Sequence, residues 1–338
     1  MHHWRGLLSR HPKQFEGIPM FTRIRRTLTT LSLAAAGVAA VTAASAQTVR
    51  YVSANGDNAN ACTREAPCRT LQRGINATPA GGEVQILNPG AYGNAVTIGK
   101  SITISAVGVS ATVGKITIDA PGATVALRGL LLNGRSVPIA NGFGIAITNA
   151  ETVHIAGCEI ERFPIYGILI TADNAEFVIS DTVVRGNDSH GLLVFGGTAR
   201  LTIQNSRFEN NGERGIDIAG SDAAVAIIGV VASGNGGNGI TATAGRMSIA
   251  STTAANNVGA GFAVIGAQMT VKSSVVSGNG GPGFVVSGGV GRASNSVFTN
   301  NNVGLSRIAG TLESRGNNTV RGNVTSQTQG TITPIPGI

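Results

Sequence analysis

The sequence predicts an all-β solenoid whose coils of 22–24 residues each carry three short strands. Two ladders of residues indicate this period. Seven asparagines recur at spacings of 24, 24, 22, 22, 22 and 22 residues, at Asn187, Asn211, Asn235, Asn257, Asn279, Asn301 and Asn323. Eight glycines keep step with them, at Gly144, Gly167, Gly191, Gly215, Gly239, Gly261, Gly283 and Gly304. In such a repeat fold each coil buries its apolar face against its neighbours.

Residues 1–46 have the features of an N-terminal extension followed by a signal peptide. A basic start at 23–26 precedes an apolar stretch at 28–41 and a small-residue cleavage site at 44–46, which leaves Gln47 first. We therefore expect an exported protein, periplasmic or extracellular, with no membrane span after cleavage. A retained anchor is the alternative, although the apolar stretch is short for a span. The start of translation, Met1 or Met20, stays open.

Much of the formal charge belongs to this leader. The chain has 25 Lys and Arg residues and 17 Asp and Glu residues, and residues 1–46 contain six and one of them. The remaining chain has 19 basic and 16 acidic residues, a net charge of +3. Because it also lacks a basic cluster interleaved with aromatic residues, the sequence does not support nucleic-acid binding.

Residues 47–80 form a distinct cap segment before the repeats. The pattern predicts a strand at 49–53 and a short amphipathic helix after Pro67 that covers the first coil. Cys62 and Cys68 lie close together in a chain expected to be exported, so we predict a disulfide between them. Cys158 is expected to be a small buried residue. No zinc-ligand spacing occurs, and no metal site or cofactor is evident.

From residue 81 to residue 323 short alternating segments predict strand after strand. Before residue 141 they are irregular, at 84–86, 96–98, 102–104, 116–118 and 125–127, and afterwards they follow the glycine ladder. Positions one and three after each Gly are predicted to face inward: Ile168 and Ile170, Leu192 and Val194, Ile216 and Ile218, Phe262 and Val264, Phe284 and Val286. The position between them varies and is predicted to face outward, as at Leu169, Leu193, Asp217, Thr241, Ala263 and Val285.

Polar residues are expected to hold the corners of the coils. Asn tolerates left-handed backbone angles and bonds within its own turn, and stacked amides can also bond to one another. A second polar column, five residues before each Asn, also predicts a structural role: Thr182, Ser206, Val230, Thr252, Ser274 and Ser296. Residues 324–338 are expected to be a loose tail or an outer strand.

These features resemble the right-handed parallel β-helix superfamily, the pectate-lyase-like fold, over residues 81–323. The segment 51–56, the Cys62 and Cys68 pair, and the segments 81–87 and 89–92 resemble the start of many secreted members. The competing fold is a leucine-rich repeat, which has a similar period. It requires a Leu-rich consensus, and residues 141–323 contain only six Leu.

The resemblance implies polysaccharide chemistry for some members, but their motifs are incomplete here. The polygalacturonase-like set is reduced to Ser189-His190-Gly191 without paired aspartates, and the epimerase-like run ends after Tyr166-Gly167-Ile168-Leu169. Lyases of this fold need Ca²⁺ held by several carboxylates, and no such cluster occurs at strand spacing, so Ca²⁺ is not supported. After Asp222 the chain has one acidic residue, Glu313, and six basic ones, so a carboxylate site must lie before about residue 222. The late basic residues are interpreted as solubilising and edge-blunting.

One candidate site remains, an outward strip made by the residues that precede the glycine ladder. These are Phe143, Tyr166, His190, Arg214 and Asn238, and stacking in register places successive members about 5 Å apart. The candidate ligand-binding residues are Tyr166, Asp188, His190, Glu213, Arg214 and Asp217, with His190, Arg214 and Asp217 as candidate catalytic groups.

Three functions follow from this strip. The first is a carbohydrate-facing binding or envelope-associated protein whose partner is a polysaccharide, acidic or neutral. The second is a divergent polysaccharide lyase or hydrolase, with His190 as base and Arg214 as charge stabiliser. The third is a non-catalytic rod or adhesin, in which the strip is a solvated face of paired charges.

Overall fold

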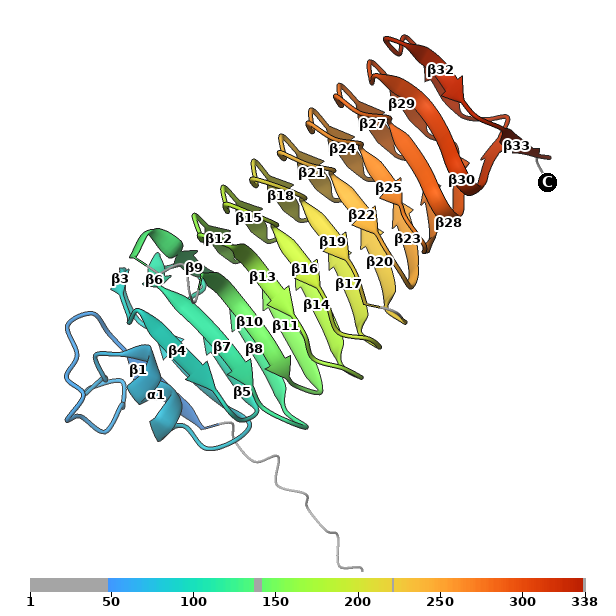
Figure 1. Ribbon diagram of the computed structural model, residues 1–338. Coiled ribbons are helices and arrows are strands. Elements are labelled where there is room, and N and C mark those ends of the chain that lie inside the picture. Colours follow the sequence, from blue (N-terminus) through green and yellow to red (C-terminus); the bar gives the residue numbers. More distant parts are fainter. Residues whose placement is uncertain (1–47, 137–141, 221, 337–338) are drawn as a thin grey trace, which may run out of the picture. The chain divides into compact units, whose positions relative to one another are not determined.

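The coils of a parallel β-solenoid make up the protein in a computed structural model that describes residues 48–136, 142–220 and 222–336 (Figure 1). The predicted extension and signal peptide, residues 1–46, lie outside the described residues. Each coil contributes one strand to each of three parallel ladders. All the strands pair with the equivalent strand of the next coil, so residues one coil apart are direct neighbours.

The first ladder contains the strands that follow the glycines: β4 (Ala95–Ile98), β7 (Lys115–Asp119), β10 (Phe143–Asn149), β13 (Tyr166–Ile170), β16 (Leu192–Val194), β19 (Ile216–Ile218), β22 (Ile240–Ala242), β25 (Phe262–Val264), the start of β28 (Phe284–Ser294), the start of β30 (Val303–Arg315) and β32 (Ser326–Gln329). The second ladder contains β1 (Val49–Val52), β2 (Gly82–Ile86), β5 (Ile102–Ser105), β8 (Thr124–Arg128), β11 (Thr152–Ala156), β14 (Glu176–Ser180), β17 (Arg200–Gln204), β20 (Ala224–Ile228), β23 (Arg246–Ala250), β26 (Gln268–Lys272), the ends of β28 and β30, and β33 (Ile332–Ile335). The third ladder contains β3 (Gly90–Ala91), β6 (Ala111–Val113), β9 (Leu130–Asn133), β12 (Glu159–Glu161), β15 (Val183–Arg185), β18 (Arg207–Glu209), β21 (Val231–Ser233), β24 (Thr253–Ala255), β27 (Val275–Ser277), β29 (Val297–Thr299) and β31 (Thr319–Arg321). A 3-10 helix, Gly134–Ser136, follows β9.

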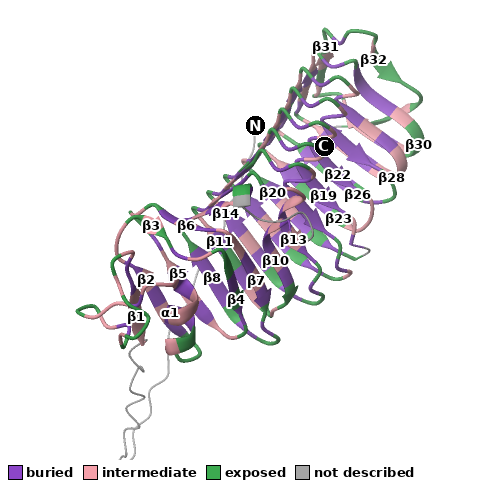
Figure 2. Ribbon diagram, turned by 60° about the vertical axis from the view of Figure 1, so that its left-hand side comes forward, coloured by how far each residue is buried: buried purple, intermediate pink, exposed green. Residues whose placement is uncertain are grey.

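The core fills the inside of the coils, and burial alternates along the strands (Figure 2). The predicted inward positions of the first ladder are confirmed, because Leu192, Ile216, Phe262 and Phe284 are all fully buried. Each large apolar side chain buried in this way contributes about 1.5–3 kcal/mol to folding. Since every coil repeats the same inward positions, this contribution accumulates along the solenoid.

The predicted outward position of the first ladder is not a solvated face. Leu193 is 9% exposed, Asp217 4%, Thr241 0% and Ala263 3%, while Leu169 and Val285 are half-buried. In two coils a residue that precedes the strand covers this position: Arg214 bonds to Asp217, and Asn238 bonds to Thr241. A side chain three residues earlier therefore lies over the sheet, which alternation alone does not predict.

The asparagine ladder is a continuous chain of buried amides. Each Nδ2 donates to the Oδ1 of the Asn one coil later, at distances of 2.8, 3.0, 2.9, 2.9, 2.8 and 3.2 Å from Asn187 to Asn323. The same Oδ1 also accepts the backbone N–H of the preceding Asn, as Asn257 does from Asn235 at 3.1 Å. In the middle of the ladder the amide also donates to a backbone carbonyl, as Asn257 does to Ala232 at 3.1 Å. Amide-to-amide bonding between successive coils therefore explains why these asparagines recur at intervals of one coil.

The left-handed corner residue is the neighbour of the ladder Asn, not the ladder Asn itself. Asn210, Asn256 and Asn300 have φ values of 53°, 55° and 56°, and Gly occupies the same place in other coils. The expectation that the ladder Asn supplies the left-handed angle was therefore wrong. The two roles divide between adjacent residues, because one turns the backbone and the other links the coils.

The glycine ladder exists because a neighbouring coil leaves no room for a side chain. A Cβ at Gly191 would lie 2.6 Å from the carbonyl oxygen of Gly215 and 2.8 Å from Nδ2 of Asn211. Gly191 and the other ladder glycines do not have positive φ. The two ladders of the sequence are thus parts of one contact, in which glycine makes space for the stacked amide.

The second polar column is also buried and structural. The hydroxyls of Ser206, Thr252 and Ser274 accept backbone N–H groups from the preceding coil at 3.2–3.4 Å. They also donate to the carbonyl two residues earlier, as Ser206 does to Gln204 at 2.8 Å. This satisfies backbone groups at the corner between the second and third ladders.

The N-terminal segment forms the expected cap. Helix α1 (Leu71–Ala77) begins after Thr70, whose hydroxyl accepts the N–H of Arg73, and it buries Leu71 and Ile75 against the core. Cys62 and Cys68 form a disulfide, as predicted, and Cys158 is a free buried thiol. Among the described residues no helix is long and apolar enough to cross a membrane. At the other end, β32 and β33 continue the ladders beyond residue 323, so the described end of this segment is an outer strand.

We expect Asn257→Ala to lower the free energy of unfolding by about 2–4 kcal/mol, because it leaves buried groups of Asn235 and Ala232 without partners. Chemical denaturation measures this change. Asn94→Ala is the matched control, since Asn94 is exposed. An equal and small effect of both substitutions would contradict a stabilising amide ladder.

Candidate functional site

Three rings stack on consecutive coils of the first ladder. Phe143 and Tyr166 are paired in register at the starts of β10 and β13, and His190 lies two residues before the start of β16. The ring centroids are 5.8 Å apart between Phe143 and Tyr166 and 5.4 Å apart between Tyr166 and His190. Phe143 and Tyr166 are partly exposed. We call Phe143, Tyr166 and His190 the ring ladder.

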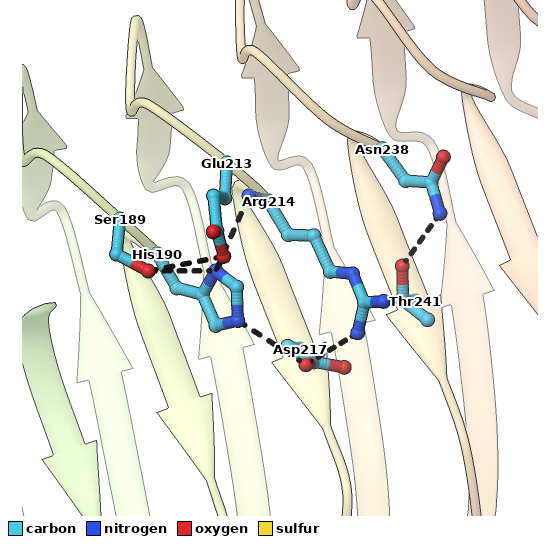
Figure 3. Close-up of polar contacts among 7 residues, drawn as sticks. All are labelled: Ser189, His190, Glu213, Arg214, Asp217, Asn238 and Thr241. Carbon is cyan, nitrogen blue, oxygen red and sulfur yellow. Dashed lines mark hydrogen bonds and ion pairs between the residues drawn. The ribbon is translucent and has the colours of Figure 1, made fainter.

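His190 ends the ring ladder in a cluster of charged residues (Figure 3). Its Nδ1 lies 3.1 Å from Oε2 of Glu213, and its Nε2 lies 3.5 Å from Oδ2 of Asp217. Ser189 adds a hydroxyl that donates to Oε2 of Glu213 at 3.1 Å. A neutral imidazole carries one N–H and can donate to only one of the two carboxylates.

Asp217 is the buried centre of this cluster. Its Oδ2 accepts a hydrogen bond of 2.6 Å from Nη1 of Arg214, whose side chain is 32% exposed. Its Oδ1 is buried and has no hydrogen-bond partner within the described residues. A buried, incompletely satisfied carboxylate costs stability. Because Leu193 and Thr241 occupy the equivalent positions of the adjoining coils, the fold itself does not need an acid here.

Burial lowers the pKa of His190 below its ordinary value of 6.5. Asp217 and Glu213 act in the opposite direction, and Arg214 adds to the lowering. His190 is therefore neutral near pH 7. The two carboxylates of Glu213 and Asp217 then accompany one guanidinium, and the exposed Asp188 lies two residues before His190 in the chain, so this surface has a negative local charge.

The structure brings together five of the six predicted ligand-binding residues. Tyr166 stacks on His190, and His190, Glu213, Arg214 and Asp217 are linked directly. Asp188 is exposed and joins none of these contacts within the described residues. Ser189 was not predicted, although its place beside His190 in the sequence could have suggested it. Among residues 48–136, 142–220 and 222–336, no three or more His, Cys, Asp or Glu side chains are arranged so that they could hold a metal ion.

A comparison with protein families identifies the fold over most of the solenoid. A sequence model for the right-handed β-helix region matches residues 74–232 and 199–325. The chain belongs to the right-handed β-helix family. No curated protein sequence matches it.

Solved structures share the β-helix fold at low sequence identity. The A-module of the mannuronan C-5 epimerase AlgE6 from Azotobacter vinelandii is 17% identical, with a TM-score of 0.54 over 79% of this chain and 95% of that one. A variant of the periplasmic alginate epimerase AlgG is 12% identical, with a TM-score of 0.59 over 76% of each chain. The ORF18 protein of Geobacillus virus E2 is 13% identical, with a TM-score of 0.57 over 85% of this chain and 61% of that one.

We expect Asp217→Val to raise the free energy of unfolding of this β-helix by about 1 kcal/mol, because it removes a buried carboxylate and leaves Arg214 able to reach water. Denaturant unfolding measures the change. The exposed partner substitution Glu213→Gln is the control and should change stability little. A loss of more than about 1 kcal/mol in Asp217→Val would show that the carboxylate supports the fold.

The lowered pKa of His190 predicts a pH-dependent stability. Because the unfolded chain binds more protons than the folded one between the two pKa values, the free energy of unfolding should fall as the pH drops from 6.5 through the folded-state pKa. Denaturation at about pH 7.5 and about pH 5 measures this drop, which should be smaller in His190→Gln. Equal drops in both proteins would contradict the assignment to His190.

Proposed function

We propose that this β-helix binds a polysaccharide along the ring ladder. The stacked rings of Phe143, Tyr166 and His190 carry the proposal, with centroid separations of 5.8 and 5.4 Å. Because the rings stack on one another, they form a rigid apolar row whose edges, and not their faces, line the surface along the coils. The edges of Tyr and His also carry polar groups, so the row can contact a chain of sugar rings that runs in the same direction.

The charges beside the rings favour a neutral glycan. Glu213 and Asp188 are exposed carboxylates that can accept hydrogen bonds from sugar hydroxyls. The only cation of the cluster, Arg214, is already paired with Asp217. An acidic glycan would therefore meet more negative charge than positive charge at this site, which opposes its binding.

The comparisons support a polysaccharide as the ligand class. Two of the similar structures are named as enzymes that act on mannuronan or alginate. That likeness is in the fold alone, and a shared fold does not establish a shared function. The proposal that this chain binds a polysaccharide therefore rests on the residues of the ring ladder.

We also propose that the protein is exported, to the periplasm or beyond the cell. The signal-like pattern of residues 23–46 and the Cys62–Cys68 disulfide support export. N-terminal sequencing of the exported protein should give Gln47 as its first residue. Protein that stays in the cytoplasm with residues 1–46 attached would overturn this proposal.

A second candidate function is proton abstraction from a polysaccharide by His190. The lowered pKa favours it, because a ring that is neutral near pH 7 can accept a proton. The assay mixes residues 47–338 with uronic-acid and neutral polysaccharides, with and without Ca²⁺, and follows ultraviolet absorbance of unsaturated ends and reducing ends. Product formation that His190→Ala abolishes would establish catalysis. A structural rod is the remaining account if neither product nor binding is found.

We expect Tyr166→Ala to weaken the binding of a neutral polysaccharide by about tenfold, because it removes the central ring of the platform. Co-sedimentation of the protein with polymer measures the affinity, and thermal unfolding checks the fold. Tyr51→Ala is the matched control, since Tyr51 is a partly exposed aromatic residue in β1. Equal affinities for Tyr166→Ala and the unchanged protein would contradict the proposed platform.

A further inference from the structure

A groove lies on the outer face of the second ladder, away from the strand positions that carry the ring ladder. It crosses β17, β20, β23 and β26 (β17, β20 and β23 are labelled in Figure 1) and has a volume of about 530 Å³. A second hollow of about 350 Å³ shares Thr270 and Arg292 with it and continues toward β30 and β33. The floor consists of small side chains that pair from coil to coil: Thr202, Ala226, Ser248 and Thr270. We call the two hollows together the basic groove.

Five basic residues line the basic groove: Arg200, Arg246, Lys272, Arg292 and Arg315. Arg200 and Arg246 belong to the same column of the ladder, with Ala224 between them. They therefore lie two coils, or about 10 Å, apart. Arg292 stands in the neighbouring column, next to Thr270.

The cations of the groove are largely unpaired. Arg200, Arg246 and Lys272 are exposed, and their side chains make no hydrogen bond or ion pair with any other residue that the structure describes. Arg292 alone is held in place, by an ion pair of 2.7 Å between its Nε and Oε2 of Glu313. The guanidinium group of Arg246 is thus free to bind an external anion, whereas Arg200 has Glu176 as its neighbour one coil away in the same column.

The sequence-based interpretation of the late basic residues, which include Arg246 but not Arg200, was a solubilising and edge-blunting role. Edge-blunting applies to the outermost strands of a sheet. Arg200 and Arg246 lie in β17 and β23, which have a partner strand on both sides. Their charge therefore protects no open edge, which leaves a solubilising role or the binding of an anion for these two arginines.

We propose that the basic groove is a second binding site that takes an acidic polysaccharide. Guanidinium groups pair with carboxylates and sulfates through charged, directional hydrogen bonds. The charge asymmetry of the chain fits this ligand, because only Glu313 is acidic after Asp222, against six basic residues. This site is independent of the ring ladder, where the local charge favours a neutral chain.

Two features define the ligand further. None of the residues that line the basic groove is aromatic, so it lacks the stacking surfaces that single-stranded nucleic acids require. At the N-terminal end the groove joins a hollow of about 660 Å³ that includes Glu151, Glu176 and Asp222, and Glu176 also lines the groove itself. These carboxylates repel an acidic chain, which should therefore bind over the coils from β20 toward β30.

The test measures binding of the full chain to polygalacturonate, with neutral dextran and oligo-deoxythymidylate as comparison ligands. We expect polygalacturonate to bind at low salt and to be released as salt rises, because exposed charges are screened. Arg246→Glu should weaken this binding by about tenfold. Arg321→Glu makes the same charge change at an exposed residue of the third ladder and should change the affinity by less than about twofold. Arg246→Lys keeps the charge and should retain most of the affinity.

Three outcomes would overturn the proposal. One is equal weakening by Arg246→Glu and Arg321→Glu, which would indicate attraction to the overall charge only. Another is no binding of polygalacturonate at low salt. The third is tighter binding of oligo-deoxythymidylate than of polygalacturonate. Because neutral polysaccharides are measured separately, their failure to bind would remove the ring-ladder proposal and leave the result for the basic groove unaffected.

Discussion

The structure depends on the stacking of coils in register, about 4.8 Å apart, and the buried asparagine ladder maintains that register. Asn257 shows the pattern: its amide donates to the amide of Asn279 in the next coil and to a carbonyl of the preceding coil, and its amide oxygen accepts the backbone N–H of Asn235. The glycine ladder is a consequence, because a Cβ at Gly191 would collide with the stacked amide of Asn211. A slip of one residue would break both contacts and turn the inward side chains outward.

Strict register converts sequence positions one coil apart into columns of side chains. A column of rings then becomes the ring ladder, and a column in which Arg200 and Arg246 flank Ala224 contributes to the basic groove. Asp217 is the exception among these columns, since it places a buried acid where the adjoining coils have Leu193 and Thr241. A buried acid that the repeat does not require is the reason why we propose a functional role for that coil of the first ladder. The ring ladder and the basic groove have opposite local charge. We therefore propose that a neutral glycan binds to the first and an acidic glycan to the second.

Much of the fold followed from periodicity. The coil length, the inward positions, the cap helix and the Cys62–Cys68 disulfide were all predicted, because each depends on local spacing or on the repeat. The burial of Asp217 was missed, since it depends on how Arg214 and His190 fold over the strand. The basic groove was missed as well. Arg200 and Arg246 are 46 residues apart in the sequence, and only the exact register of three coils shows that they share a column.

The central claim is that this β-helix binds polysaccharides on two faces with different charge requirements. The most direct measurement is retention of the unmodified protein on immobilised neutral and acidic polysaccharides, each at low and at high salt. The account predicts that retention on neutral chains persists at high salt, while retention on acidic chains is lost as the arginines are screened. Absence of retention on both classes at low salt would contradict the account and leave a structural rod as the role of the fold.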